Sequence, residues 1–85
     1  MGFELGRDRA LLRLLELLGE GRKYTAELLD ALREWGRGHE ALKEAVRLGL
    51  VKRYREGRRV YNELTARGVE ALRLARGATL GAEVP

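Results

Sequence analysis

Cysteine is absent from this 85-residue chain, and histidine occurs only once, at His39. Without cysteine there can be no disulfide, no thiolate ligand for a metal and no cysteine nucleophile. A single histidine argues against a tetrahedral zinc or copper site, so we predict no metal and no cofactor. The chain also lacks a glycine-rich phosphate loop that follows a strand, and other catalytic constellations. These absences predict a protein that is not an enzyme.

Glutamine is absent as well, and Asn62 is the only asparagine. Depletion of these thermolabile amides is typical of proteins from hot habitats, which predicts a thermophile, although GC-rich coding produces a similar composition. No apolar run approaches the roughly 20 residues that span a bilayer. The start, Met1 to Gly6, is too short and too mixed for a signal peptide. We therefore expect a soluble cytoplasmic protein with no membrane partner.

Positive charge is concentrated in one segment. Seventeen Lys and Arg residues against thirteen Asp and Glu residues give a net charge of +4. Between Val51 and Val60, Glu56 is the only acid and five residues are basic, so the local charge (five minus one) also equals +4. The remainder of the chain is balanced, and the basic character belongs to this segment, through Lys52, Arg53, Arg55, Arg58 and Arg59.

The first helical pattern is unusually rich in leucine. Asp8 can act as the N-cap of a helix that ends near Leu18. A surface helix needs an apolar arc of only about 100°. Six leucines nearly encircle this one: Leu11, Leu12, Leu14, Leu15, Leu17 and Leu18. The helix is therefore either central in the core or packed against another subunit with its second face.

Two further helical patterns follow. Thr25 can cap a second helix from Ala26 to about Trp35, and the apolar side chains that we expect to face inward are Leu28, Leu29, Leu32 and Trp35. A short turn rich in glycine, residues 36–38, leads to a third helix over residues 38–48. A steep crossing of two helices across so short a turn is the helix-turn-helix arrangement.

The third helix has a polar outer face and a glycine stop. Spacing places Leu42, Ala45 and Val46 inward. Gly49 is expected to take the left-handed conformation, with Leu50 folding back on Ala45. The residues left outside are His39, Glu40, Lys43, Glu44 and Arg47.

Residues 51–55 and 58–64 read as two strands around a Glu56-Gly57 turn. In this register Arg55 faces Arg58 across the hairpin, an unfavourable pairing that an anion between them would relieve. Thr65 can then cap a last helix that ends near Arg76. We predict one domain over residues 6–76 and a flexible tail over residues 77–85.

The sequence carries three short motifs: YTAEL at 24–28, LGLVKR at 48–53 and VYNELTARG at 60–68. Together they resemble motifs of winged helix-turn-helix transcription regulators of the small archaeal and bacterial DNA-binding type. LGLVKR resembles the exit from their recognition helix. VYNELTARG at 60–68 is similar to the junction between their β-hairpin, the wing, and the last helix. YTAEL at 24–28 resembles the entry to their second helix. The resemblance implies a mostly α fold with a small β-hairpin, in the order α-α-α-β-β-α.

The resemblance also implies a function. The third helix (38–48) would enter the major groove of double-stranded DNA, and the wing (51–64) would lie on the backbone or in the minor groove. A homodimer through the first and last helices is expected. The candidate DNA-binding residues on the turn, the third helix and the wing are Arg37, His39, Lys43, Arg47, Lys52, Arg53, Arg55, Arg58 and Arg59.

Other interpretations stay open. Winged helices also serve as protein–protein interaction modules, and a non-specific, chromatin-like DNA binder would need the wing but no base contacts. The basic hairpin could be a solvated surface of a thermophilic protein. Glu40 and Glu44 could accept from cytosine, or could form ordinary salt bridges with Lys43 or Arg47.

Overall fold

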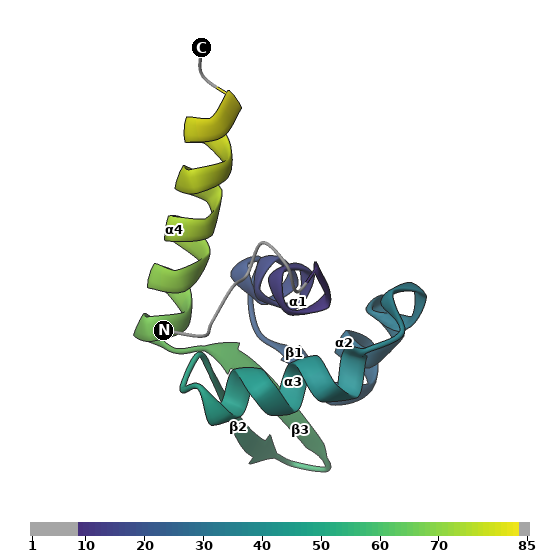
Figure 1. Cartoon of the computed structure of the whole chain (residues 1–85). Helices are drawn as coiled ribbons and strands as arrows, with labels where there is room; N and C mark the ends of the chain where they lie inside the picture. Colours follow the sequence, from purple (N-terminus) through teal and green to yellow (C-terminus); the bar gives the residue numbers. More distant parts are fainter. Residues whose placement is uncertain (1–8, 84–85) are drawn as a thin grey trace.

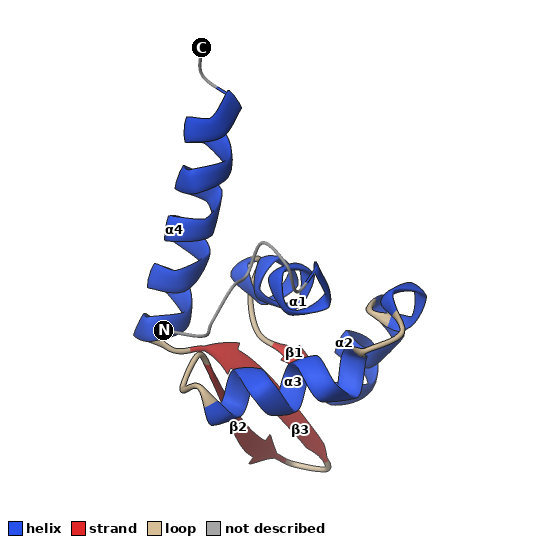
Figure 2. Cartoon of the chain, in the orientation of Figure 1, coloured by secondary structure: helices blue, strands red, loops and turns tan. Residues whose placement is uncertain are grey.

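The structure, a computed structural model, describes residues 9–83 (Figures 1 and 2). The predicted N-cap, Asp8, lies outside the described residues. The strands form one antiparallel sheet in the order β1-β3-β2. No helix in the described part of the chain is long and apolar enough to cross a membrane. The elements are α1 (Arg9–Gly19), β1 (Lys23–Tyr24), α2 (Thr25–Ala31), the 3₁₀ helix η1 (Arg33–Trp35), α3 (Gly38–Arg47), β2 (Val51–Glu56), β3 (Arg59–Leu64) and α4 (Ala66–Glu83).

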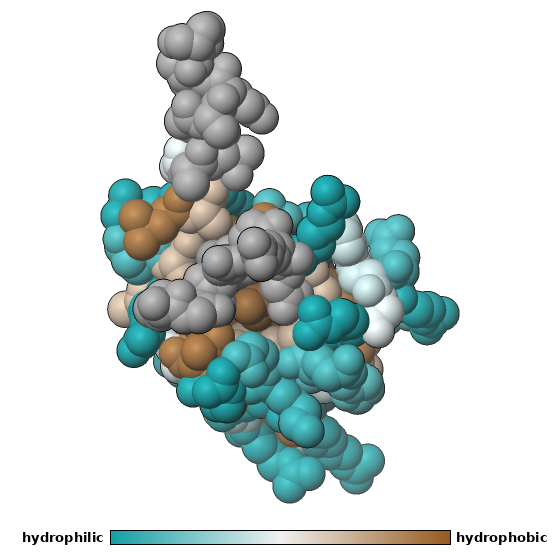
Figure 3. Space-filling view, in the orientation of Figure 1, coloured by the Kyte–Doolittle hydropathy of each residue, from teal (hydrophilic) through white to brown (hydrophobic). Residues whose placement is uncertain are grey.

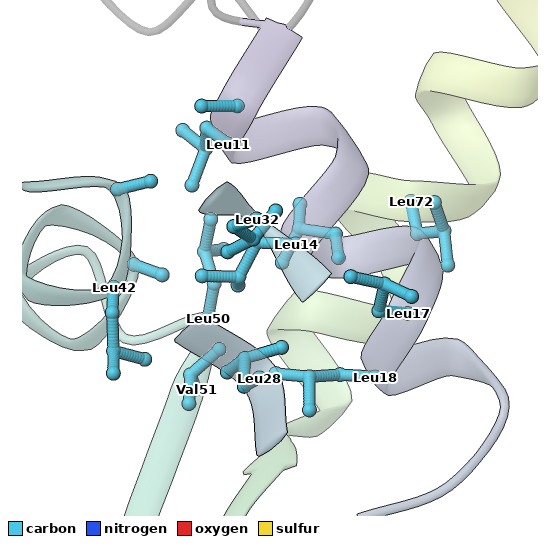
Figure 4. Close-up of a cluster of buried hydrophobic side chains, with 14 residues drawn as sticks. Leu11, Leu14, Leu17, Leu18, Leu28, Leu32, Leu42, Leu50, Val51 and Leu72 are labelled. Atoms are coloured by element: carbon cyan, nitrogen blue, oxygen red, sulfur yellow. The ribbon is translucent and has the colours of Figure 1, made fainter. Parts of the chain in front are cut away.

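Helix α1 is the centre of the core. Leu14 and Leu15 are completely buried, Leu12 is half-buried, and the other leucines of the helix are buried as well. The helix contacts α3, α4 and β3, so its apolar surface is covered from several directions. Figure 4 shows its side chains meeting leucines from the second helix, the strand entry and α4. The central-core interpretation of the leucine-rich helix is therefore confirmed.

Helix α2 ends at Ala31, earlier than predicted, and the chain then tightens into η1. Leu28 and Leu32 are buried, but Trp35 is 37% exposed, so its predicted inward placement is wrong. Helix α2 positions Leu28 but has ended before Trp35, which belongs to the short turn η1, so α-helical spacing from the two leucines no longer fixes the direction of its side chain.

Thr25 does not cap α2, in contrast to the prediction. The N-cap is Tyr24, and no side chain caps this end of the helix. The Thr25 hydroxyl instead donates to the carbonyl oxygen of Val60 (3.3 Å), because the strand β3 lies beside it. This contact ties the start of α2 to the sheet.

Helix α3 ends as predicted. Gly49 has a φ of 76°, and the Leu50 amide donates to the Ala45 carbonyl oxygen (2.9 Å), which completes a left-handed helix stop. Ala41, Leu42 and Ala45 are buried against the core. Val46 is 39% exposed, because it lies at the edge of the narrow arc that these residues bury, and its predicted inward placement is wrong.

Strand β1 has no counterpart among the predicted elements. Two residues are too few to show alternation, and the strand forms only because Lys23 and Tyr24 pair with Asn62 and Tyr61 of β3. Asn62 is completely buried, and its Nδ2 donates to the Lys23 carbonyl oxygen (3.2 Å) and to Thr25 Oγ1 (3.1 Å). The one asparagine of the chain thus joins β1 and α2 to the hairpin.

The hairpin turn lies one residue later than predicted. Arg55 pairs with Val60 and Glu56 with Arg59, so the predicted opposition of Arg55 and Arg58 is wrong. Gly57 has a φ of 64°, which only glycine adopts without strain, and it therefore takes the first of the two turn positions. Because Arg55 and Arg58 do not face each other in this register, the pairing gives no reason to expect an anion between them.

Helix α4 begins with the predicted cap. The Gly68 amide donates to Thr65 Oγ1 (3.0 Å), and the same hydroxyl donates to the Gly49 carbonyl oxygen (2.6 Å). The helix continues to Glu83, so residues 77–83 of the predicted tail are helical. Figure 1 shows α4 projecting well beyond the other elements.

Candidate nucleic-acid interface

The outer face of α3 is polar and exposed. His39, Glu40, Lys43 and Arg47 are exposed, and Glu44 is half-buried. Figure 3 shows hydrophilic side chains over α3 and the hairpin on the same side of the molecule. The exposed Val46 adds one apolar side chain to this polar surface. The predicted recognition helix, α3, therefore presents a surface of charged, polar and apolar side chains that is accessible to a partner.

One of the two glutamates of α3 is in a salt bridge. Arg47 Nε donates to Glu44 Oε1 (3.1 Å), and its Nη2 donates to Glu44 Oε2. These hydrogen bonds lower the pKa of Glu44 and raise that of Arg47. The salt-bridge interpretation of Glu44 is confirmed, and much of the Arg47 charge is compensated on the helix itself. Lys43 is left as the basic group at the middle of this face.

The start of α3 adjoins a shallow groove. Arg37 occupies the N-cap position, and His39 follows in the first turn. The groove runs between α2 and this turn and is lined in part by Leu29, Arg33 and His39. The predicted residues Arg37 and His39 thus lie at the entrance of α3, where backbone N–H groups are available to a phosphate.

The basic residues of the hairpin divide between two faces of the sheet. Because side chains alternate along a strand, Arg53 and Arg55 share the face of the buried Val51, and Lys52 and Glu56 share the other. Arg53 Nη2 donates to Thr25 Oγ1 (3.2 Å), so this arginine is held against the start of α2. In the described part of the chain, the guanidinium groups of Arg55 and Arg58 make no hydrogen bond or ion pair.

Three tyrosines cover the outer face of the sheet, opposite the buried Asn62. The rings of Tyr54 and Tyr61 are stacked with centroids 6.1 Å apart, and Tyr24 meets Tyr61 edge-on at 6.3 Å. The Arg59 guanidinium lies 4.4 Å from the centre of the Tyr24 ring. Arg59 is therefore turned back onto the sheet by a cation–π contact, unlike Arg55 and Arg58.

Arg22 completes this cluster and was not among the predicted site residues. Its Nη1 and Nη2 donate to Glu56 Oε2 and Oε1, both at 3.0 Å, and Nη1 also donates to the Tyr54 hydroxyl at 3.0 Å. The hydrogen bonds from Arg22 lower the pKa of Glu56. Arg22 thus neutralises the one carboxylate between residues 51 and 60. A contact between residues 34 positions apart leaves no local sequence signal.

The residues predicted as a site are brought together in two adjoining groups. Helix α3 carries one group and the hairpin the other, and α3 contacts β2 directly. Arg55, Arg58 and Lys43 are available to a ligand, whereas Arg47, Arg53 and Arg59 also have partners within the protein. The surface therefore offers fewer basic side chains without a protein partner than the sequence suggests.

Comparison with solved structures shows the fold. The chain is similar to RosR of H. salinarum, with a TM-score of 0.79, 24% identity, and coverage of 95% of this chain and 82% of that one. It is similar to a possible transcriptional regulator for arsenical resistance (TM-score 0.57, 23% identity, 95% and 93% covered). It also resembles a homodimeric winged helix-turn-helix DNA-binding domain from Mycobacterium bovis, described as possibly of the ArsR family (TM-score 0.58, 21% identity, 100% and 94% covered).

These likenesses confirm the predicted winged helix-turn-helix fold, in which α2 and α3 form the helix-turn-helix and β2 and β3 form the wing. No protein-family model and no curated protein sequence matches the chain.

Proposed function

We propose that this protein is a DNA-binding transcription regulator, with α3 in the major groove and the wing on the backbone or in the minor groove. The observation that carries the proposal is the joining of an exposed, polar α3 to a basic hairpin in one surface. The similarity to a winged helix-turn-helix DNA-binding domain supports it. Such a regulator would act in the cytoplasm of a prokaryotic cell.

The exposed side chains of α3 suit the edges of base pairs. The major groove of B-DNA is about 12 Å wide and admits an α-helix. Lys43 can donate to guanine O6 and N7 or to a phosphate, and Val46 can contact the methyl group of thymine. Arg47 is held by Glu44, which fixes the direction in which its remaining N–H groups point.

The wing suits the phosphate backbone. A Lys or Arg that neutralises a phosphate releases condensed counterions, and this release favours binding at low salt. Arg55 and Arg58 are exposed near the end of the hairpin, and Arg22 cancels the charge of Glu56 beside them. The wing is therefore more basic toward an anion than its composition alone indicates.

Binding to mixed-sequence duplex DNA across a salt series tests the proposal. We expect binding at low salt, with log K falling linearly against log salt by about 0.9 for each phosphate that the protein neutralises. Competition between a genomic operator fragment and mixed DNA then separates a specific regulator from a chromatin-like binder. Absence of binding even at low salt would contradict the proposal, and a search for a protein partner would follow.

We also infer that the protein forms a homodimer through α4 and the side of α1 that carries Leu12, the one leucine of α1 that its own chain leaves half-buried. Val69 and Leu74 on α4 are 55% and 57% exposed. A groove beside α4 is lined by Leu18, Leu64 and Leu72 together with charged side chains that include Glu63 and Arg73. Figure 1 shows α4 projecting beyond the other described helices and strands. The similar domain from M. bovis is homodimeric.

Replacing Leu74 by glutamate is expected to give a monomer that binds DNA more weakly. A charge at an apolar contact has no partner across the interface and opposes association. Because Leu74 is exposed within one chain, the fold itself should persist. Light scattering coupled to gel filtration, at micromolar protein, measures the oligomeric state.

Val46→Glu provides the control, since Val46 is an exposed apolar residue on α3 rather than α4. This variant should remain dimeric. A wild-type protein that is monomeric at the same concentration would rule out the dimer.

A further inference from the structure

Arg22 reaches across the whole sheet to the outer end of the wing. It precedes β1, which is one edge strand, and Glu56 is the last residue of β2, which is the other. Both Glu56 oxygens accept from the Arg22 guanidinium at 3.0 Å. On the way the guanidinium passes over β3, where it lies 4.1 Å from the centre of the Tyr61 ring. One side chain that starts beside β1 therefore contacts both strands of the wing.

The outer half of the wing has few other attachments. β1 pairs only with Tyr61 and Asn62. The part of the hairpin from Val60 back to the turn therefore extends past the end of β1. The turn at Gly57 forms the outer end of the hairpin, opposite the end at which its two strands join the rest of the domain. In the described residues, three side-chain contacts join residues 55–60 to elements outside the hairpin: Arg22 with Glu56, Arg59 with Tyr24, and the Thr25 hydroxyl with the Val60 carbonyl oxygen.

The contacts of Arg22 support one another. Its guanidinium binds a carboxylate in the planar, two-bonded geometry that lysine cannot reproduce, and it also covers a tyrosine ring. The Tyr54 hydroxyl accepts from Arg22 and donates to Glu63 Oε1 (3.1 Å). The network fixes Arg22 in one orientation at the surface of the sheet.

We propose that Arg22 is a positioning residue for the wing: its pairing with Glu56 holds the outer half of the hairpin in the orientation in which Arg55 and Arg58 meet DNA. This inference rests on the proposed DNA-binding function. Ordering a mobile segment on binding reduces affinity, and a segment that is ordered beforehand avoids that cost. Arg22 therefore acts on DNA affinity through the wing, without a DNA contact of its own.

Two substitutions separate positioning from simple electrostatics. For each of them, the change in net charge alone predicts a different DNA affinity from the one that positioning predicts. Arg22→Lys keeps the charge but loses the two-bonded geometry and the ring contact. Glu56→Gln makes the wing more positive, so electrostatics alone predicts tighter binding. Positioning predicts weaker binding for both, by about two- to fivefold, as expected for loss of a partly exposed ion pair.

Glu70→Gln is the matched control. Glu70 on α4 also accepts two hydrogen bonds from an arginine, Arg73, and its replacement changes the net charge by the same amount. Glu70 lies on a different element from the wing, so a Glu70→Gln protein that keeps the wild-type oligomeric state should bind DNA as tightly as the wild type or slightly more tightly.

The order of the wing itself is measured without DNA, by amide hydrogen exchange of residues 55–59 in the free proteins. We expect faster exchange in Arg22→Lys and Glu56→Gln than in the wild type and Glu70→Gln. Faster exchange together with weaker binding supports the proposal. Tighter binding of Glu56→Gln, or unchanged exchange in both variants, overturns it. If the wild type binds no DNA, the proposed function fails, while the exchange rates still decide whether Arg22 orders the hairpin.

Discussion

Replacing Gly68 by alanine is expected to lower the melting temperature of the domain by about 15–30 °C or to prevent folding. Gly68 is buried in the first turn of α4. A Cβ atom at this position would lie 2.0 Å from the carbonyl oxygen of Leu50 and 3.0 Å from its carbonyl carbon. Such distances are far inside van der Waals contact, so the helix or the strand entry must shift.

Neither side can shift easily. The Leu50 carbonyl oxygen accepts from the Thr65 amide (3.0 Å), and Thr65 caps α4 through the Gly68 amide. Moving α4 away from Leu50 therefore breaks the cap and the hydrogen bond together. We expect a loss of about 4 kcal/mol, at the upper end of single substitutions and a large part of the stability of a small domain. Circular dichroism during heating measures it.

Gly77→Ala is the control within the same helix. A Cβ atom at Gly77 would meet nothing within 4 Å. Alanine in the interior of a helix is favoured over glycine, so this variant should gain about 0.5–1 kcal/mol. A Gly68→Ala protein that melts within a few degrees of the wild type would contradict the close approach of α4 to Leu50.

The double substitution Arg55→Ala with Arg58→Ala is expected to weaken DNA binding by about 10- to 100-fold near 0.1 M salt. It should also reduce the slope of log K against log salt by about two, one for each phosphate contact removed. The guanidinium groups of both residues lack partners among the described residues, so their loss should not disturb the fold. Fluorescence anisotropy with a labelled duplex measures both quantities.

Removing the same charge elsewhere separates a local contact from net charge. Arg73→Ala with Arg76→Ala takes two arginines from α4, which Figure 1 shows projecting away from the hairpin. In a variant that keeps the wild-type oligomeric state, the slope should be nearly unchanged. Equal losses in the two double variants would mean that the wing has no special role.

Local patterns predict much of this fold. The stop at Gly49 and the cap at Thr65 were predictable because each depends on residues within a few positions of one another. The placement of Trp35 was not predictable, because the apolar pattern continues to Trp35 and gives no signal that α2 ends and a 3₁₀ helix follows. Strand β1 escaped prediction for a related reason, since two residues acquire a strand conformation only through pairing with β3.

The candidate site divides in the same way. The identity of the exposed residues on α3 followed from helical spacing, and only Val46 was misplaced. The sequence could not show which cations are already engaged, because Arg53 and Arg59 find their partners on elements far away in the chain. Nor could it show that Arg22 neutralises Glu56, although this contact decides how basic the wing is.

The most direct test of the account is to follow the backbone amide resonances of isotope-labelled protein while a short DNA duplex is added. The account predicts that the shifts concentrate in residues 38–47 of α3 and 51–59 of the wing, with little change at the far end of α4. Shifts confined to α1 and α4, or no shifts at low salt, would contradict the claim that α3 and the wing together form a DNA-binding surface.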